Sequence, residues 1–192
     1  MDKKIDQAPR SLKKNEMIRS AYDIFYKNGF HATGVDAILE GTGISKRTLY
    51  KHFISKEGLI IAAIGHYHQI MLASIIKYIE KSPFESFLDK VLSIFDFLSE
   101  QVDGGNLNGC FAMNAKTEYV NKSKEIEMAS EAYSIAQQQL IERYLHMQGL
   151  ANSRSLAIQV LMLFEGAIVR SKSVGNSKPI HLAKVAAGLI CR

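Results

Sequence analysis

Apolar residues recur at helical spacing along most of the chain, whereas the alternation of apolar and polar residues that is typical of strands is missing. The helical pattern is interrupted where glycine, proline and asparagine gather, and these interruptions divide the chain into about nine helices. We therefore predict an all-α fold, in which three N-terminal helices form a small domain over residues 1–55 and the other helices form a bundle over residues 56–192.

The first three predicted helices have the spacing of a helix-turn-helix unit. The first covers residues 12–28 and ends before Gly29, a good C-terminal cap. We predict Thr33 as the N-cap of a short second helix. Glycines break the chain at residues 41–43, and a third short helix begins behind Ser45. Two short helices joined by a tight turn and set against an earlier helix can place the second one in the DNA major groove.

Longer helices are predicted for the rest of the chain. Ser55 caps the fourth, and the capping box Ser82-Pro83-Phe84-Glu85 predicts that the fifth begins at Pro83. The predicted ranges are 56–79, 83–101, a segment around 110–120, 124–147, 153–172 and 179–191.

The outer face of the third helix has the chemistry of a DNA reader. Leu49 and Phe53 are spaced to point inward together. The residues left outside can all donate hydrogen bonds, and they are Ser45, Lys46, Arg47, Thr48, Tyr50, Lys51 and His52. Lysine and arginine can pair with guanine in the major groove, and tyrosine or a lysine near the helix end can reach phosphates.

Positive charge is concentrated in the N-terminal part. The chain has a net charge of +5, and residues 1–57 hold eleven Lys and Arg against seven Asp and Glu, whereas the later residues hold thirteen against twelve. Nucleic-acid readers concentrate positive charge in this way, but a solvated basic face is common in soluble domains as well. Charge alone leaves both interpretations open.

A run of short motifs between residues 12 and 60 matches a known family. The motifs are Ala21-Tyr22-Asp23-Ile24-Phe25, Asn28-Gly29-Phe30, Thr33-Gly34-Val35, the run from Gly43 to Phe53, and Ser55-Lys56-Glu57. Through them the sequence resembles the TetR family of transcriptional regulators. The resemblance implies a repressor that a small-molecule effector releases from a palindromic operator. It puts Ser45, Lys46, Arg47 and Thr48 where the family reads bases, Tyr50, His52 and Lys56 where it grips phosphates, and Thr33 as a cap beside the backbone.

The last two predicted helices are strongly apolar, through residues such as Val160, Phe164, Val185 and Leu189. Their faces could seal the core of the chain or form a dimer seam, and the residues alone leave both possibilities open. The resemblance implies a homodimer through these helices, with double-stranded DNA and a small-molecule effector of unknown identity as partners.

An effector pocket has no linear signature, because its apolar lining looks like core. The candidate lining residues are Phe87, Phe95, Cys110, Phe111, Met113, Tyr133 and Phe164, and ordinary core packing is the alternative at each. The sequence Gly109-Cys110-Phe111 resembles a subgroup of the family in which some members sense electrophiles or oxidants through such a cysteine. Redox sensing through Cys110 is therefore an alternative mode of regulation.

Other classes of function find little support in the sequence. It has no phosphate-binding glycine loop, no Gly-x-Ser-x-Gly, no His-Glu-x-x-His and no Cys-x-x-Cys, so we expect no enzyme, no cofactor and no metal. The two cysteines indicate a reducing compartment, and the longest apolar run, residues 59–64, is too short for a secretory signal or a membrane span. We expect a cytoplasmic protein without a membrane partner. A helical interaction module that does not read DNA is the remaining alternative.

Overall fold

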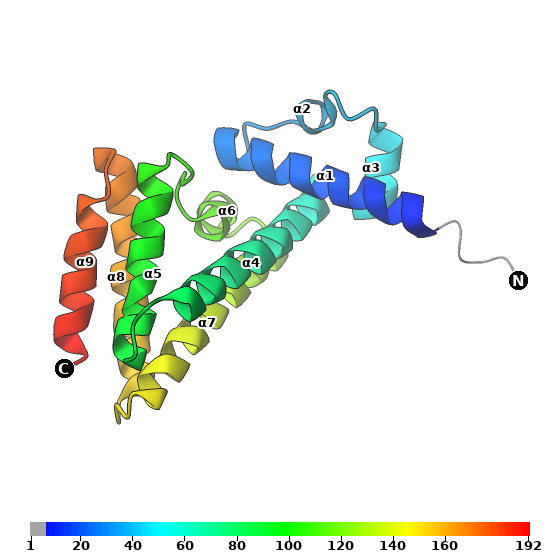
Figure 1. Cartoon of the computed structure of the whole chain (residues 1–192). Helices are drawn as coiled ribbons and strands as arrows, with labels where there is room; N and C mark the ends of the chain where they lie inside the picture. Colours follow the sequence, from blue (N-terminus) through cyan, green and yellow to red (C-terminus); the bar gives the residue numbers. More distant parts are fainter. Residues whose placement is uncertain (1–6) are drawn as a thin grey trace, which may run out of the picture. The chain divides into compact units, whose positions relative to one another are not determined.

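The computed structural model describes residues 7–192, with side chains from residue 12 onward. This part of the chain forms nine helices and no strand (Figure 1), which confirms the all-α prediction. The helices are α1 Gln7–Asn28, α2 Val35–Leu39, α3 Lys46–Phe53, α4 Lys56–Lys81, α5 Phe87–Asp103, α6 Phe111–Tyr119, α7 Lys124–Met147, α8 Ser153–Val174 and α9 Lys178–Ile190.

The helices belong to two compact units that do not follow the order of the chain. The first unit contains the chain up to Gln69 together with Phe111–Ser130, and the second contains Ile70–Cys110 and Glu131–Arg192. Helices α4 and α7 therefore contribute residues to both units. The division into domains at residues 55 and 56 stays a prediction.

The core of the first unit combines aliphatic and aromatic side chains. Helices α1, α2 and α3 contact one another, and Ile38 and Leu49 are fully buried among them. Phe111, the first residue of α6, is also fully buried, and its ring lies 5.0 Å from that of Tyr22 and 5.5 Å from that of Tyr67. Burying a large apolar side chain contributes about 1.5–3 kcal/mol, so this cluster fixes α6 firmly beside α1 and the first half of α4.

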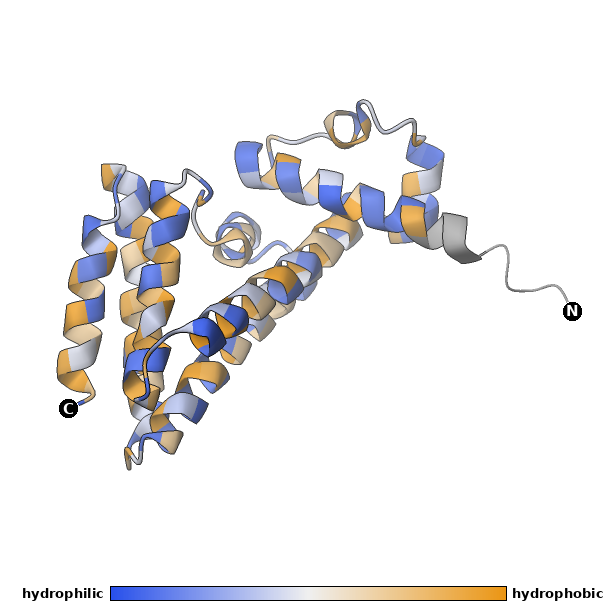
Figure 2. Ribbon diagram, viewed as in Figure 1, coloured by the Kyte–Doolittle hydropathy of each residue, from blue (hydrophilic) through white to orange (hydrophobic). Residues whose placement is uncertain are grey.

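The second unit is built on α5, α8 and α9, which lie side by side (Figure 1). Helix α5 buries residues on most of its circumference, and its Phe95 meets Phe164 of α8 edge to face with 5.5 Å between the ring centroids. Lys184 of α9 forms an ion pair with Asp96 of α5. Figure 2 shows apolar residues along these helices, interrupted by hydrophilic ones.

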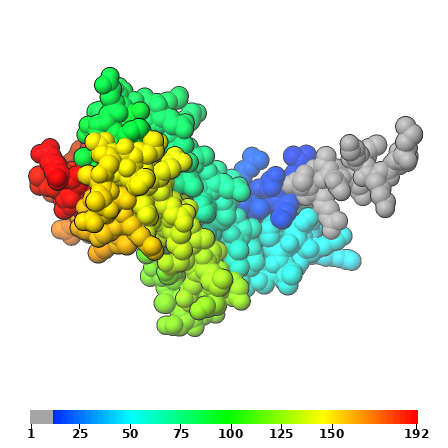
Figure 3. Space-filling model, turned by 90° about the horizontal axis from the view of Figure 1, so that it is seen from below, coloured from blue at the N-terminus to red at the C-terminus, as the bar shows by residue number. Residues whose placement is uncertain are grey.

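Helices α8 and α9 use part of their apolar surface inside the unit and leave part exposed. Val160 and Phe164 are buried, so these two side chains seal the core of the chain. Six other apolar side chains of α8 and α9, here called the outer set, are between 43% and 71% exposed. Figure 3 shows both helices, orange and red, at the surface. This outer set comprises Ile158, Met162, Val169, Leu182, Val185 and Leu189.

Helix α4, with 26 residues, is the one helix in the described chain that is long and apolar enough to cross a membrane by length and composition. Its apolar residues form a buried stripe that includes Ile60, Ile64, Ile75 and Ile79, each at most 3% exposed. A stripe of this kind is also the pattern of a core helix in a soluble protein.

The predicted start of the fifth helix is wrong. Helix α5 begins at Phe87, where the Ser86 hydroxyl accepts a hydrogen bond from the amide of Asp89 at 3.2 Å. The reason is that α4 continues to Lys81, and the amide of Ser82 donates to the carbonyl of Ile79. Ser82 therefore follows the last residue of α4, and its hydroxyl makes no capping hydrogen bond.

Thr33 is not the N-cap of α2, contrary to the prediction. The N-cap is Gly34, which makes no side-chain capping bond, and the Thr33 hydroxyl donates to the carbonyl of Gly29 at 2.6 Å. Helix α1 begins at Gln7, five residues before the predicted start. Several boundaries are confirmed: Asn28 ends α1, Ser45 caps α3, and the seventh and eighth helices begin where the sequence predicts.

Candidate nucleic-acid interface

Helix α3 is fixed by its inner face and by both of its ends. Leu49 is fully buried and Phe53 is 7% exposed. At the start of the helix the Ser45 hydroxyl accepts a hydrogen bond from the amide of Thr48, and at its end Ile54 takes a φ of 66° while its amide donates to the carbonyl of Tyr50. The outer face is therefore presented by a short, well-anchored helix.

The residues predicted to read DNA lie together on this helix and its N-cap. Most of them are exposed, and Thr48 and His52 are half-buried. The Thr48 hydroxyl shares a hydrogen bond of 3.0 Å with Ser45, whereas Tyr50 is 44% exposed. The exposed members are Ser45, Lys46, Arg47, Tyr50 and Lys51. Contact of each with DNA stays a prediction.

Lys46 has an intramolecular partner. Its Nζ lies 2.8 Å from Oδ1 of Asp36 in α2, and this hydrogen bond and the carboxylate charge raise the pKa of Lys46. Both side chains are more than half exposed, so the ion pair contributes little to stability and a phosphate or a base could replace Asp36.

Two predicted contacts lie away from the outer face of α3. Lys56 is half-buried at the first residue of α4, with its Nζ 6.0 Å from the centre of the Phe25 ring. Thr33 is only 2% exposed and its hydroxyl is already bonded to Gly29, so the structure does not bring Thr33 to the surface of the reader.

Glu118 of α6 is a residue that sequence reasoning missed. Its carboxylate accepts hydrogen bonds from the amides of Phe30, at 3.1 Å, and His31, at 2.8 Å, in the turn after α1. The His31 ring stacks on Tyr119 with 4.6 Å between centroids. These contacts tie α6 to the helix-turn-helix within one compact unit. Because Glu118 lies 87 residues from His31, no local pattern in the sequence could have indicated the contact.

The predicted effector residues fall in both compact units. Phe111 and Met113 belong to the first unit, where Phe111 is core, and the other five belong to the second unit. Cys110 is 8% exposed, and among the described residues neither cysteine forms a disulfide. The five in the second unit are Phe87, Phe95, Cys110, Tyr133 and Phe164. Their contact with an effector stays a prediction.

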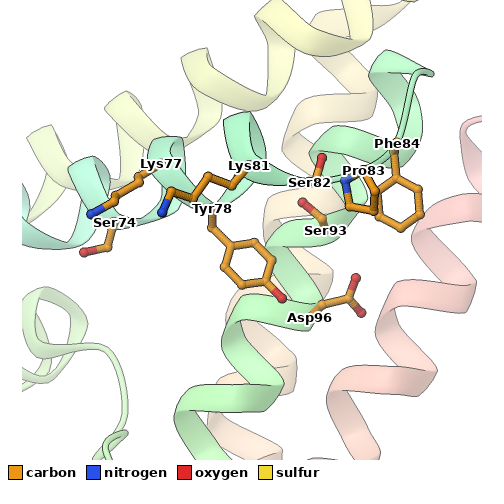
Figure 4. Close-up of a pocket in the computed structure, with 9 residues that line it drawn as sticks. All are labelled: Ser74, Lys77, Tyr78, Lys81, Ser82, Pro83, Phe84, Ser93 and Asp96. Carbon is orange, nitrogen blue, oxygen red and sulfur yellow. The ribbon is translucent and has the colours of Figure 1, made fainter.

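A pocket of about 550 Å³ lies in the second unit, between the C-terminal half of α4 and α5 (Figure 4). None of the predicted effector residues lines it. Its lining residues are Ser74, Lys77, Tyr78, Lys81, Ser82, Pro83, Phe84, Ser93 and Asp96. Within the described chain, no group of three or more His, Cys, Asp or Glu side chains is arranged to hold a metal ion.

Two family models match the chain. One, described as bacterial regulatory proteins of the tetR family, matches residues 17–63, and the other, described as the C-terminal domain of LmrA/YxaF-like transcriptional regulators, matches residues 88–186. The second match alone spans more than half of the chain.

Individual relatives agree with these matches. The transcriptional activator FasR of Mycolicibacterium smegmatis is 23% identical over 190 residues, which are 96% of this chain and 83% of FasR. The transcriptional regulator UidR of Escherichia coli K12 is 39% identical over 75 residues, which are 39% of this chain and 38% of UidR. The crystal structure of reduced E. coli NemR has a TM-score of 0.82 at 16% identity, over 91% of this chain and 94% of NemR.

Proposed function

The chain belongs to the TetR family of bacterial regulatory proteins, a family of helix-turn-helix transcriptional regulators and not of enzymes, and we propose that it represses transcription from a palindromic operator until a small-molecule effector releases it. One observation carries the proposal: α3 presents a continuous hydrogen-bonding and basic surface on a helix that is anchored from within. FasR is named an activator, so repression is a specific part of the proposal.

In this proposal α3 enters the major groove. Lys46 and Arg47, at the start of the helix, pair with guanine edges, and Ser45 and Thr48 reach neighbouring bases. The side chains nearer the end of the helix and at the start of α4 hold the phosphates on either side. The proposed phosphate contacts are Tyr50, Lys51, His52 and Lys56.

We infer a homodimer through α8 and α9. Met162, Val169 and Leu182 are each more than 60% exposed, a degree of exposure that large apolar side chains seldom show in quantity on the surface of a monomer. A Cβ added at Gly166 of α8 would meet nothing within 4 Å, so a second helix has room to approach closely there. A two-fold dimer would put its two α3 helices about 34–36 Å apart, one turn of DNA.

The effector and the compartment complete the proposal. TetR-family regulators are soluble DNA-binding proteins, so we place this chain in the cytoplasm, where its operator is. The effector binds in the second unit, which contains all of α5, α8 and α9 and the pocket beside α4. A ligand can release the operator only by binding the DNA-free conformation better than the DNA-bound one.

Binding-site selection from random duplexes, followed by fluorescence anisotropy on the selected duplex, tests this function. We expect a palindromic site whose affinity falls steeply with salt. Arg47→Ala should cost about 1–3 kcal/mol and relax the choice of one base pair, whereas Tyr50→Phe should weaken all duplexes alike. Lys178→Ala, which removes an exposed charge from α9, is the control for net charge.

A folded dimer that selects no sequence would indicate an interaction module and would overturn the proposal. A transcription assay on the selected site then decides between repression and activation.

A further inference from the structure

The pocket between α4 and α5 combines apolar surfaces with unneutralised positive charge. Tyr78, Pro83 and Phe84 line it together with Lys77 and Lys81. In Figure 4 the two lysines extend along α4 on one side of the Tyr78 ring, and Pro83 and Phe84 lie on the other side. Its volume of about 550 Å³ falls inside the range of about 300–1,000 Å³ that is usual for small-molecule sites.

The two lysines are the charges at this pocket that lack a partner. Lys77 and Lys81 are exposed, are spaced i and i+4 on one face of α4, and make no ion pair with any carboxylate among the described residues. Like charges at this spacing repel each other. An anion placed beside both would remove that repulsion and gain two charge-assisted hydrogen bonds.

The acidic groups at the pocket are already occupied. Asp96 is paired with Lys184 of α9, and the carboxylate of Glu100 accepts a hydrogen bond of 2.6 Å from the Tyr78 hydroxyl. Burial and this hydrogen bond raise the pKa of Tyr78, so the phenol stays neutral and adds no negative charge. The pocket therefore offers unpaired donors but no unpaired carboxylate, and this arrangement selects against a cation.

The wall of the pocket also contains an unsatisfied polar atom. The Ser82 hydroxyl is buried and has no hydrogen-bond partner within the described structure. A buried hydroxyl without a partner costs about 1–3 kcal/mol, and such groups are rare enough to need an explanation. Protein atoms cover this oxygen, so a bound molecule could supply the missing partner only after the segment that follows α4 shifts.

We propose that this pocket binds a carboxylate attached to an apolar body, either aromatic or aliphatic, with Lys77 and Lys81 holding the carboxylate and Tyr78, Pro83 and Phe84 packing against the body. The inference rests on the proposed function, which it deepens by naming the place and the chemical class of the effector. It also differs from the site predicted from the sequence, because none of those seven residues lines this pocket.

Isothermal titration calorimetry of the full chain tests the site without DNA. The probes are 2-naphthoate, cinnamate and octanoate, each paired with its neutral primary amide. We expect at least one carboxylate to bind at one molecule per chain, and its amide to bind about tenfold or more weakly, because the amide loses the charge-assisted contacts. If no carboxylate binds, or if carboxylate and amide bind equally, the proposal is wrong.

Variants locate the binding. Lys77→Gln combined with Lys81→Gln should weaken the carboxylate about tenfold or more, and Ser74→Trp should fill the pocket and abolish binding. Lys178→Gln, an exposed lysine outside the pocket, should bind as the wild type does. Circular dichroism should show all variants folded, and carboxylate binding that survives both pocket variants would overturn the site.

Operator binding separates the two proposals. The pocket variants should bind the selected duplex as tightly as the wild type does and should no longer be released by the carboxylate. If the wild type binds the carboxylate in this pocket but binds no duplex specifically, the regulatory function fails and the site stands. If the wild type binds its duplex but no carboxylate, the site alone fails.

Discussion

At the scale of single residues, the ion pair between Lys46 and Asp36 shows that a reader residue has an intramolecular partner before DNA binds. The pair links α3 to α2 at a distance of 2.8 Å. If Lys46 contacts DNA as we propose, the DNA has to displace the Asp36 carboxylate, which itself repels phosphates. The sequence indicated Lys46 as an exposed donor, but it could not reveal the pair, because the two residues lie ten positions apart on different helices.

We predict that Asp36→Asn strengthens operator binding by about two- to fivefold, the range expected when an exposed ion pair no longer competes. The dependence of log K on log salt should steepen by about one unit, because the surface that faces DNA loses one negative charge. Anisotropy titrations at several salt concentrations measure both effects. Glu40→Gln removes a nearby exposed carboxylate that forms no ion pair among the described residues, and it is the control. Weaker binding by Asp36→Asn would mean that Asp36 orients Lys46 for base reading.

At the scale of helices, the accuracy of prediction depended on how local the determining interactions are. The last residue of α1 and the first residue of α3 could be predicted, because Gly29 and Ser45 make their capping contacts with residues no more than four positions away. The start of α5 could not, because two serine-based caps compete within five residues and the continuation of α4 decides between them. The grouping of α6 with the helix-turn-helix depends on contacts almost ninety residues apart and has no local signature.

The competition between the two caps gives a direct test. Ser86→Ala should destabilise the protein by about 1 kcal/mol, because the amide of Asp89 loses its acceptor. Ser82→Ala should be neutral or stabilising, because the buried Ser82 hydroxyl has no partner to lose in the described structure. Urea unfolding followed by circular dichroism compares the two variants, which differ only in which serine is truncated. If Ser82→Ala lost more unfolding free energy than Ser86→Ala, Ser82 and not Ser86 would be the residue that caps α5.

Glu118 connects α6 to the turn after α1, and we predict that its removal affects both stability and DNA binding. Glu118→Ala leaves the amides of Phe30 and His31 without their acceptor and should cost about 1–3 kcal/mol in the free energy of unfolding. Operator affinity should also fall, although Glu118 does not lie on α3.

Matched variants separate this role from general damage to α6. Glu118→Gln keeps an acceptor oxygen and should recover part of the stability. Thr117→Ala changes the neighbouring exposed residue, whose hydroxyl donates to the Met113 carbonyl of its own helix, and should leave operator affinity unchanged. Operator binding by Glu118→Ala at wild-type strength would show that the contact stabilises the unit without positioning the reader.

At the scale of the whole molecule, the class of fold and the DNA-reading helix could be predicted from the sequence more fully than the arrangement of the helices that follow residue 55. Reader residues are recognisable because their polarity contrasts with the apolar residues of the same short helix. Apolar positions in the body could serve a core, a pocket or a seam, and only the structure distinguishes buried Phe164 from exposed Val169. The pocket beside α4 escaped prediction because its lining combines exposed residues of α4 with Pro83 and Phe84, which the sequence assigned to a helix and which lie between α4 and α5.

The exposed surface of α8 and α9 leads to the prediction that Val169→Glu converts a dimer into a monomer. Val169 is 71% exposed in the single chain, so glutamate there should leave the fold intact but put two like charges near each other across a two-fold seam. Light scattering coupled to size exclusion should show half the wild-type mass. Affinity for the palindromic duplex should fall about a hundredfold or more, because the two half-sites are no longer bound by linked readers.

Met128→Glu, at a residue of α7 that is 62% exposed, tests whether any exposed charge has the same effect, and it should remain dimeric. If Val169→Glu also remains dimeric, the chains associate through another surface, and the spacing of about 34–36 Å between readers must be derived from that surface instead.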